Sequence, residues 1–151
     1  MKTIITYGTF DLFHVGHVRL LQRLKRLGDR LVIGLSTDEF NTQKGKTVVI
    51  PYADRKEVLL SCKYVDDVFP EENWEQKRQD IQRENADIFA IGDDWIGKFD
   101  DLNDIVDVLY LPRTQDISTT DIKAVMSQIE EDKKKEIKNL FSHLSSLVTK
   151  L

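Results

Sequence analysis

Short apolar runs alternate with segments of helical periodicity along most of this chain, and that alternation constrains its fold more than any other feature. The runs at residues 4–7, 31–36, 65–69, 87–91 and 108–111 predict strands. The segments at residues 15–27, 54–63 and 75–84 predict helices between them. The almost wholly apolar run at 31–36 is typical of a parallel strand that is covered on both faces. The sequence therefore predicts an α/β fold with a doubly wound parallel sheet. Ligands of such sheets bind beyond the carboxyl ends of the strands, so we expect the chemistry in the loops after residues 7, 36, 91 and 111.

The charge and cysteine content limit the classes of partner and compartment. The chain has 22 Lys or Arg and 26 Asp or Glu, a formal net charge of -4, and no basic block. This balance argues against a nucleic-acid partner and is compatible with a small phosphorylated ligand. The single cysteine, Cys62, excludes a disulfide framework and fits a reducing cytosol. No apolar run approaches the roughly 20 residues of a membrane span, and the first residues lack the apolar stretch of a signal peptide. We therefore expect a cytoplasmic protein without membrane insertion.

The first predicted strand leads into a loop with two histidines, residues 8–17 (GTFDLFHVGH). His14 and His17 stand at the start of the next predicted helix, with Gly16 between them. A helix N-terminus carries unsatisfied N–H groups and partial positive charge, so it favours anions. Helix capping or zinc binding are the alternatives for the two imidazoles. Zinc would need three or four ligands, and only His143 and Cys62 remain to supply them. The loop therefore predicts a phosphate site and no metal ligand.

A second loop, residues 113–121 (RTQDISTTD), follows the last predicted strand. Ser118 can cap a helix, and Asp121 completes a box-like capping pattern three residues later. By itself this is an ordinary capped helix. Together with the histidine loop on a neighbouring strand, it predicts a two-ended cradle for a polyphosphate.

The composition changes near residue 130, so we expect a domain over residues 1–129 and a helical extension over residues 130–151. Seven apolar residues of the extension recur at steps of mainly three and four residues, from Ile137 to Leu151. Such a stripe is suited to packing against another helix. A terminal helix folded back on its own domain and a dimer or partner contact both fit this pattern.

Several segments resemble a known family. The loop at 8–17 and the segment 117–120 (ISTT) resemble the two signatures of the H-x-G-H nucleotidyltransferase superfamily. The segments 73–77 (NWEQK), 92–95 (GDDW) and 113–120 resemble its glycerol-3-phosphate cytidylyltransferase family, in the same order along residues 3–129. The resemblance implies a Rossmann-like nucleotidyltransferase fold with an added C-terminal helix. It also implies transfer of the cytidylyl group of CTP to sn-glycerol 3-phosphate, giving CDP-glycerol and pyrophosphate for teichoic acid biosynthesis. We expect Mg²⁺ with the CTP, and a homodimer.

A phosphate oxygen is already a competent nucleophile at neutral pH, so we expect catalysis from alignment and charge stabilisation without a general base. The resemblance implies four catalytic residues, namely His14, His17, Lys44 and Arg113. It implies a nucleotide site made of Thr9, Phe10, Asp11, His14, Val15, Gly16, His17, Lys44, Arg55, Asp94, Arg113, Thr114, Gln115, Asp116, Ile117, Ser118, Thr119 and Thr120. It assigns Lys46 and Lys77 to the acceptor substrate.

Each of these side chains also has an ordinary interpretation. Lys44 and Lys46 could be a solvated surface pair, and for Lys77 the sequence alone favours a solvated helix face. Arg55 could make a structural salt bridge. Asp11 and Asp94 could orient a cationic side chain or share Mg²⁺ with the nucleotide, but turn and capping roles suit an aspartate equally well. We favour orientation for Asp11.

Trp74 and Trp95 could form a wall for the base or the glycerol, but large aromatic residues in such segments more often pack in the core or at the rim, and we leave them out of the catalytic set. Lys63 occupies a position where the family pattern more often has Arg. Lysine keeps the charge but lacks the planar guanidinium, so we do not place Lys63 in the site. Two other functions compete with the one that the resemblance implies. The acceptor could be another phosphorylated alcohol, phosphocholine or phosphoethanolamine, or the chain could be a nucleotide-binding regulatory module without turnover.

Overall fold

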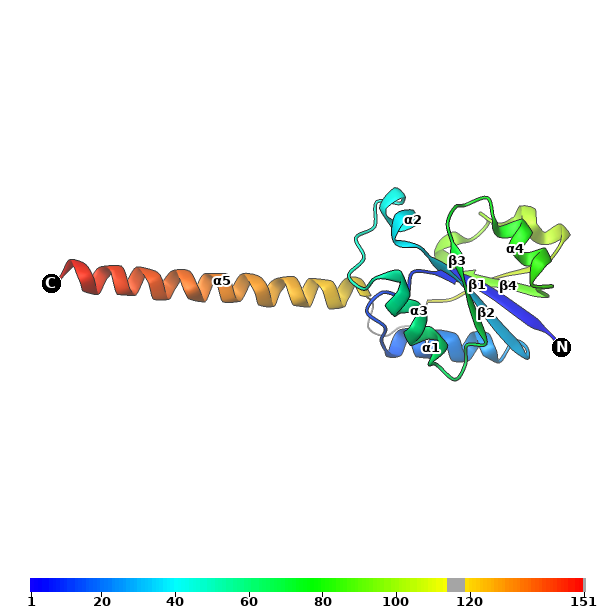
Figure 1. Ribbon diagram of the computed structural model, residues 1–151, viewed down its shortest axis with the longest axis horizontal. Helices are drawn as coiled ribbons and strands as arrows, with labels where there is room; N and C mark the ends of the chain where they lie inside the picture. Colours follow the sequence, from blue (N-terminus) through cyan, green and yellow to red (C-terminus); the bar gives the residue numbers. More distant parts are fainter. Residues whose placement is uncertain (114–118, 151) are drawn as a thin grey trace. The chain divides into compact units, whose positions relative to one another are not determined.

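A computed structural model describes residues 1–113 and 119–150 of the chain. Five parallel strands form one sheet in the order β3-β2-β1-β4-β5 (Figure 1). They are β1 (Thr3–Gly8), β2 (Arg30–Ser36), β3 (Asp67–Glu71), β4 (Ile88–Gly92) and β5 (Asp107–Leu111). The strand order reverses between β1 and β4, which opens a crevice at their carboxyl ends. The predicted doubly wound α/β fold is confirmed.

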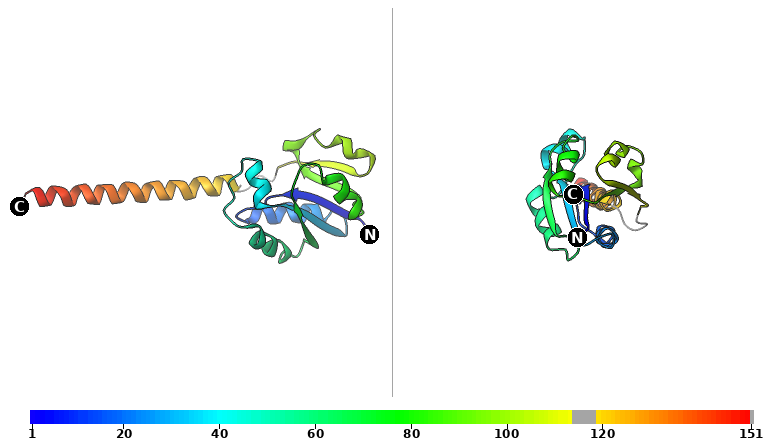
Figure 2. Two further views of the ribbon diagram at one scale, coloured as in Figure 1. Left: turned by 45° about the horizontal axis from the view of Figure 1, so that its top comes forward. Right: turned by 90° about the vertical axis from the view of Figure 1, so that its right-hand side faces the viewer.

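Helices cover both faces of this sheet. They are α1 (Val15–Lys25), α2 (Asp38–Gln43), α3 (Tyr52–Leu60), α4 (Lys77–Arg83), and the 3-10 turns η1 (Asp93–Trp95) and η2 (Asp100–Asp104). Leu21 of α1 and Leu59 of α3 belong to one buried core cluster, and Ile81 of α4 belongs to the other. Figure 2 (left) accordingly shows α1 and α3 on one side of the sheet and α4 on the other. Alternate residues of β1 enter the two clusters, Ile4 the first and Ile5 the second, as the period of a strand requires.

A glycine makes room for an aromatic ring beneath the carboxyl end of β1. Tyr7 and Gly34 are partners in the register of β1 and β2, and a Cβ on Gly34 would lie 2.3 Å from the Tyr7 ring. The ring also meets Phe69 and Phe89 edge-on, with centroids 5.9 and 5.5 Å away. Its hydroxyl donates a 2.9 Å hydrogen bond to Asp80. Tyr7 therefore forms a rigid floor where the strand ends.

The boundaries follow the predictions within a few residues, with two informative differences. The sequence does not predict α2, which has only six residues and one large apolar side chain, Phe40; a side-chain cap from Thr37 begins it. The third strand is predicted at 65–69 but runs from Asp67 to Glu71, because Val65 is buried in the core without belonging to the strand. This shift brings Glu71 to the carboxyl edge of the sheet.

The last helix, α5, runs from Thr119 to Thr149 without a break, and so passes through the predicted boundary at residues 129 and 130. The chain divides into two compact units, Met1–Asp116 and Ile117–Leu151. None of the described residues of α5 is buried. Its large apolar side chains are exposed from Val125 to Val148. Among the helices that the structure describes, none is long and apolar enough to cross a membrane.

Candidate active site

A small cavity of about 70 Å³ opens where β1, β2, β3 and β4 end. Three lysine side chains line it, Lys44, Lys46 and Lys77, together with the indole rings of Trp74 and Trp95. The cavity thus lies at the carboxyl edge of the sheet, where the sequence predicts the ligand.

The two histidines form the N-terminal cap of α1. The His14 Nδ1 atom accepts a 3.0 Å hydrogen bond from the backbone N–H of Gly16, and the backbone N–H of His14 donates to the His17 Nδ1 atom at 3.2 Å. This reciprocal arrangement is a capping box in which imidazoles replace the usual hydroxyl and carboxylate. The rings stack with centroids 3.9 Å apart. Helix capping, one of the alternatives for these residues, is therefore confirmed.

The capping bonds fix the chemistry that remains for each imidazole. Because Nδ1 of each ring accepts a hydrogen bond, the neutral ring must carry its proton on Nε2. Burial, and next the neighbouring His14, lower the pKa of His17 to about 4. Burial also lowers the pKa of His14. Both rings are thus neutral near pH 7, and each has an Nε2–H group suited to donating to an anionic oxygen.

Aromatic rings and a strained loop hold His17 in place. Its ring lies 5.3 Å from that of Phe10 and stacks on Phe13 at 5.5 Å, measured between centroids. Phe10 and Leu12 both have φ of 51°, a left-handed conformation that non-glycine residues adopt infrequently and at some cost. Such conformations concentrate at functional loops, and here they bring the Phe10 ring against His17.

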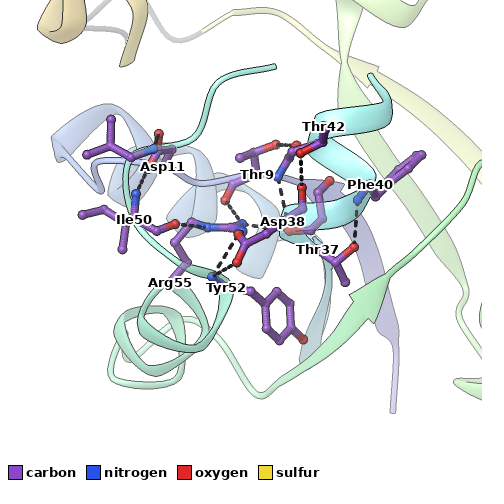
Figure 3. A network of polar contacts seen from close by, with 12 residues as sticks. Thr9, Asp11, Thr37, Asp38, Phe40, Thr42, Ile50, Tyr52 and Arg55 are labelled. Carbon is purple, nitrogen blue, oxygen red and sulfur yellow. Dashed lines mark hydrogen bonds and ion pairs between the residues drawn. The ribbon is translucent and has the colours of Figure 1, made fainter. Parts of the chain in front are cut away.

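Asp11 and Arg55 tie the loop after α2 to the ends of the first two strands (Figure 3). The buried Asp11 carboxylate accepts from the backbone N–H groups of Val49 and Ile50 at 2.8 and 2.9 Å. Arg55 is buried, with 2% of the residue exposed. Its guanidinium donates to four groups at 2.7 to 2.9 Å, namely the carbonyls of Thr9, Ser36 and Ile50 and the carboxylate of Asp38. The structural salt bridge is thus present, while a nucleotide contact of Arg55 and the orientation of a cationic side chain by Asp11 stay predictions.

The loop lysines differ in exposure. The Lys44 ammonium donates a 2.9 Å hydrogen bond to Ser36 Oγ and lies 4.4 Å above the centre of the Phe40 ring. Burial lowers the pKa of Lys44 to about 8. Lys46 is exposed at the rim of the cavity. Gly45 between them has φ of +73°, the conformation that lets this loop bend.

Lys77 is buried, contrary to the solvated helix face that the sequence alone favours. It is 3% exposed, and its ammonium lies 2.8 Å from Glu71 Oε2. It also lies over the rings of Tyr7, Trp74 and Phe99, at 4.5, 5.1 and 5.2 Å from their centroids. An ammonium buried among three rings and a carboxylate is a fixed positive charge that faces the cavity.

Some of the remaining predicted site residues are described by the structure and others are not. Asp94 is exposed on η1 after β4, and Val15 is 48% exposed at the start of α1. Arg113 is exposed just after β5. Thr119 and Thr120 begin α5 in the second unit. Thr114, Gln115, Asp116, Ile117 and Ser118 lie outside the described residues.

Among the cavity residues that sequence reasoning misses, two are polar residues that end strands. Ser36 and Glu71 line the cavity as the last residues of β2 and β3. A polar residue that ends a buried strand is the signal that could have found them. For Glu71 that signal is hidden, because the predicted strand ends two residues too early.

Comparisons with known proteins agree with this geometry. A family described as cytidylyltransferase-like matches residues 5–125. The glycerol-3-phosphate cytidylyltransferase of Bacillus subtilis (strain 168) is 60% identical over 123 residues, which are 82% of this chain and 95% of that relative. The enzyme of the same name from Staphylococcus aureus is 51% identical over 123 residues, 82% of this chain and 93% of the relative.

A solved structure shares the fold. The lipopolysaccharide core biosynthesis protein from Thermoplasma volcanium GSS1 aligns with a TM-score of 0.66 and 23% identity, over 76% of this chain and 99% of that chain. At this identity the likeness supports the fold alone. The sequence relatives go further, since they match nearly their whole length at more than half of the positions. The chain therefore belongs to the cytidylyltransferase family, in its group of glycerol-3-phosphate cytidylyltransferases.

Proposed function

We propose that this protein transfers the cytidylyl group of CTP to sn-glycerol 3-phosphate, forming CDP-glycerol and pyrophosphate, for teichoic acid biosynthesis in the cytoplasm. The observation that carries the proposal is the pair of imidazoles that cap the N-terminus of α1 through their Nδ1 atoms, in a chain with three lysines around one cavity at the same edge of the sheet. The high identity to enzymes of that name supports the choice of both substrates.

In this reaction a phosphate oxygen of the acceptor attacks the α-phosphorus of CTP. A new P–O bond forms while the bond to the β-phosphate breaks, and pyrophosphate leaves with the electron pair. The Nε2–H groups of His14 and His17 would donate to oxygens that gain charge in the transition state, and the N-terminus of α1 would add its partial positive charge. Neither histidine needs to give up or accept a proton, which suits their lowered pKa values.

The three cavity lysines would contact different phosphate groups of the two substrates. Following the family resemblance, Lys44 contacts the CTP phosphates, while Lys46 and Lys77 contact the acceptor phosphate. Arg113, which follows β5, would clamp further phosphate oxygens with its planar fork. These fixed cations favour the alignment of two anionic substrates that would otherwise repel each other.

We propose that Mg²⁺ comes to the site with the nucleotide. Within residues 1–113 and 119–150, no three His, Cys, Asp or Glu side chains gather as a metal-binding group. Mg²⁺ commonly binds one or two carboxylates together with substrate phosphates and water. Asp94, exposed on η1, is the carboxylate that we propose for it. When bound, the ion would offset charge on the triphosphate.

The surroundings of Lys77 favour an acceptor whose alcohol part carries no positive charge. A trimethylammonium group is usually bound by a cluster of aromatic rings. Here the space among Tyr7, Trp74 and Phe99 holds the ammonium of Lys77, which would repel a second cation. Phosphocholine and phosphoethanolamine are therefore poorer candidates than glycerol 3-phosphate.

The apolar stripe of α5 supports the proposal of a homodimer. Its exposed side chains between Ile137 and Val148 recur at the steps of three and four residues that pair helices in coiled coils. A second copy would bury both stripes. Deletion of residues 133–151 should reduce the mass in solution from dimer to monomer, measured by light scattering. An unchanged mass would refute this role of the stripe.

The test of the enzymatic function uses the pure protein with CTP, Mg²⁺ and one acceptor at a time. We expect release of pyrophosphate and formation of CDP-glycerol with glycerol 3-phosphate, detected by a coupled phosphate assay and mass spectrometry. Turnover only with phosphocholine or phosphoethanolamine would refute the acceptor. Binding of CTP without turnover of any acceptor would instead support a regulatory module.

A further inference from the structure

A buried carboxylate links two of the three cavity lysines. Glu71 ends β3 and is 3% exposed. Its Oε2 atom contacts the Lys77 ammonium at 2.8 Å, and its Oε1 atom accepts a 2.7 Å hydrogen bond from the Ser36 hydroxyl. Ser36 Oγ in turn accepts from the Lys44 ammonium at 2.9 Å. The four side chains form one continuous chain of hydrogen bonds, Lys44–Ser36–Glu71–Lys77.

The direction of the bonds in this chain is fixed. An ammonium only donates and a carboxylate only accepts, so the Ser36 hydroxyl must accept from Lys44 and donate to Glu71. Ser36 is fully buried. Neither it nor Glu71 can therefore exchange its partner for water without opening the site. The two lysine ammonium groups are thus held in a fixed relation by groups that come from the ends of β2 and β3.

We propose that Glu71, which acts directly on Lys77 and through Ser36 on Lys44, is the positioning residue that holds both ammonium groups aimed into the cavity. This inference deepens the proposed function and rests on it, since the lysines matter for turnover only if they contact the phosphates. Glu71 itself needs no contact with a substrate. Its negative charge offsets part of the positive charge of the two ammonium groups. The substrate phosphates would supply the remaining negative charge.

A positioning role differs from a merely structural one in its effect on ionisation. Burial lowers the pKa of Lys44 to about 8, the charge of Glu71 opposes that decrease, and the charges of Lys46, Lys77 and Arg55 add to it. Removal of the Glu71 charge must then lower the pKa of Lys44 further. Lys44 would lose its proton at a lower pH, and the alkaline limb of activity would move with it.

The test compares Glu71→Gln with Glu72→Gln, which removes the same charge from the next, exposed residue. We expect Glu71→Gln to lower kcat/KM about 10- to 100-fold, as the loss of hydrogen bonds between charged groups does. We also expect its alkaline limb to shift toward lower pH. Glu72→Gln should stay within about twofold of the wild type. A folded Glu71→Gln protein with the wild-type rate and alkaline limb would overturn the proposal.

Ser36→Ala provides a second test that keeps every charge. It removes both hydrogen bonds of the Ser36 hydroxyl, to Lys44 and to Glu71, so the alkaline limb should again move toward lower pH, while the ion pair between Glu71 and Lys77 remains. If Glu71→Gln does not fold, Ser36→Ala decides alone. A wild-type alkaline limb in this variant would overturn the role of the link.

A measurement without turnover separates this inference from the enzymatic proposal. The NMR titration of lysine labelled with ¹³C at Cε reports the pKa of Lys44 directly, in the full chain without substrate. A lower pKa in Glu71→Gln than in Glu72→Gln supports the positioning role even if the wild type forms no CDP-glycerol. An identical pKa in both variants overturns it even if the wild type is fully active.

Discussion

Replacement of Arg55 by alanine would show whether this buried guanidinium mainly supports the loops or mainly binds the nucleotide. The residue is 2% exposed, and its side chain donates to three carbonyls and one carboxylate. Its removal leaves the carbonyls of Thr9, Ser36 and Ile50 without this donor, and Asp38 without its cation. Asp38 is about half exposed, so the loss of its cation costs little, whereas the three carbonyls left without this donor cost about 3–5 kcal/mol together. For a domain of this size, such a loss lowers the Tm by about 8–20 °C.

The assay is thermal unfolding followed by circular dichroism, together with the KM for CTP at a temperature where the variant is folded. Arg78→Ala is the matched control, because Arg78 also donates to one carboxylate and one carbonyl, those of Asp104 and Asp101, but on the surface. Its Tm should hardly change. Arg55→Lys should recover part of the lost stability, since one ammonium can donate to some of these acceptors but cannot replace the fork. A Tm of Arg55→Ala within about 3 °C of the wild type, with a raised KM for CTP, would refute this reasoning.

Three further predictions concern the histidines and the packing beneath the site. His17→Asn keeps an oxygen that can accept from the His14 N–H but loses the Nε2–H donor, so turnover should fall about 100- to 1,000-fold with little change in Tm, measured by steady-state kinetics and calorimetry. Because the pKa of folded His17 is about 4, below the usual value near 6.5, the unfolded chain binds a proton first. This residue's contribution to the free energy of unfolding should thus be complete above pH 6.5 and be lost between pH 6.5 and 4, a dependence that urea titrations should find reduced in His17→Asn. Gly34→Ala places a Cβ 2.3 Å from the Tyr7 ring and should destabilise the protein by about 1–3 kcal/mol in the same measurement.

The central strands β1 and β2 were predictable because each is a local run with few polar residues. Nearly every residue of β1 and of β2 is buried, so their sequence signal does not depend on the rest of the fold. α2 carries no such signal. It has only six residues, and it forms because Thr37 caps it and Phe40 is buried beneath it. The burial of Phe40 comes from tertiary contacts, which the local sequence does not reveal.

The histidine loop was predictable in position but not in mechanism. The pattern of His14, Gly16 and His17 indicates a helix start that suits an anion, and helix capping is the competing interpretation of the same residues. The hydrogen bonds show that the two roles depend on each other. Capping uses Nδ1 of each ring, and so it leaves the proton on Nε2. The cap is therefore what makes each neutral ring a donor with a defined direction.

The buried charges could not be predicted, because their partners are far away in the sequence. Ser36 meets Glu71 across 35 residues, and Arg55 meets Thr9 across 46. The composition of residues 75–84 predicts a solvated helix. Lys77 is nevertheless buried there, because Glu71 and three aromatic rings surround its ammonium group. The net charge of -4 conceals this arrangement. The buried Glu71 carboxylate offsets part of the positive charge of the cavity lysines in the absence of substrate. A net negative charge of the chain is therefore compatible with a local site for phosphate.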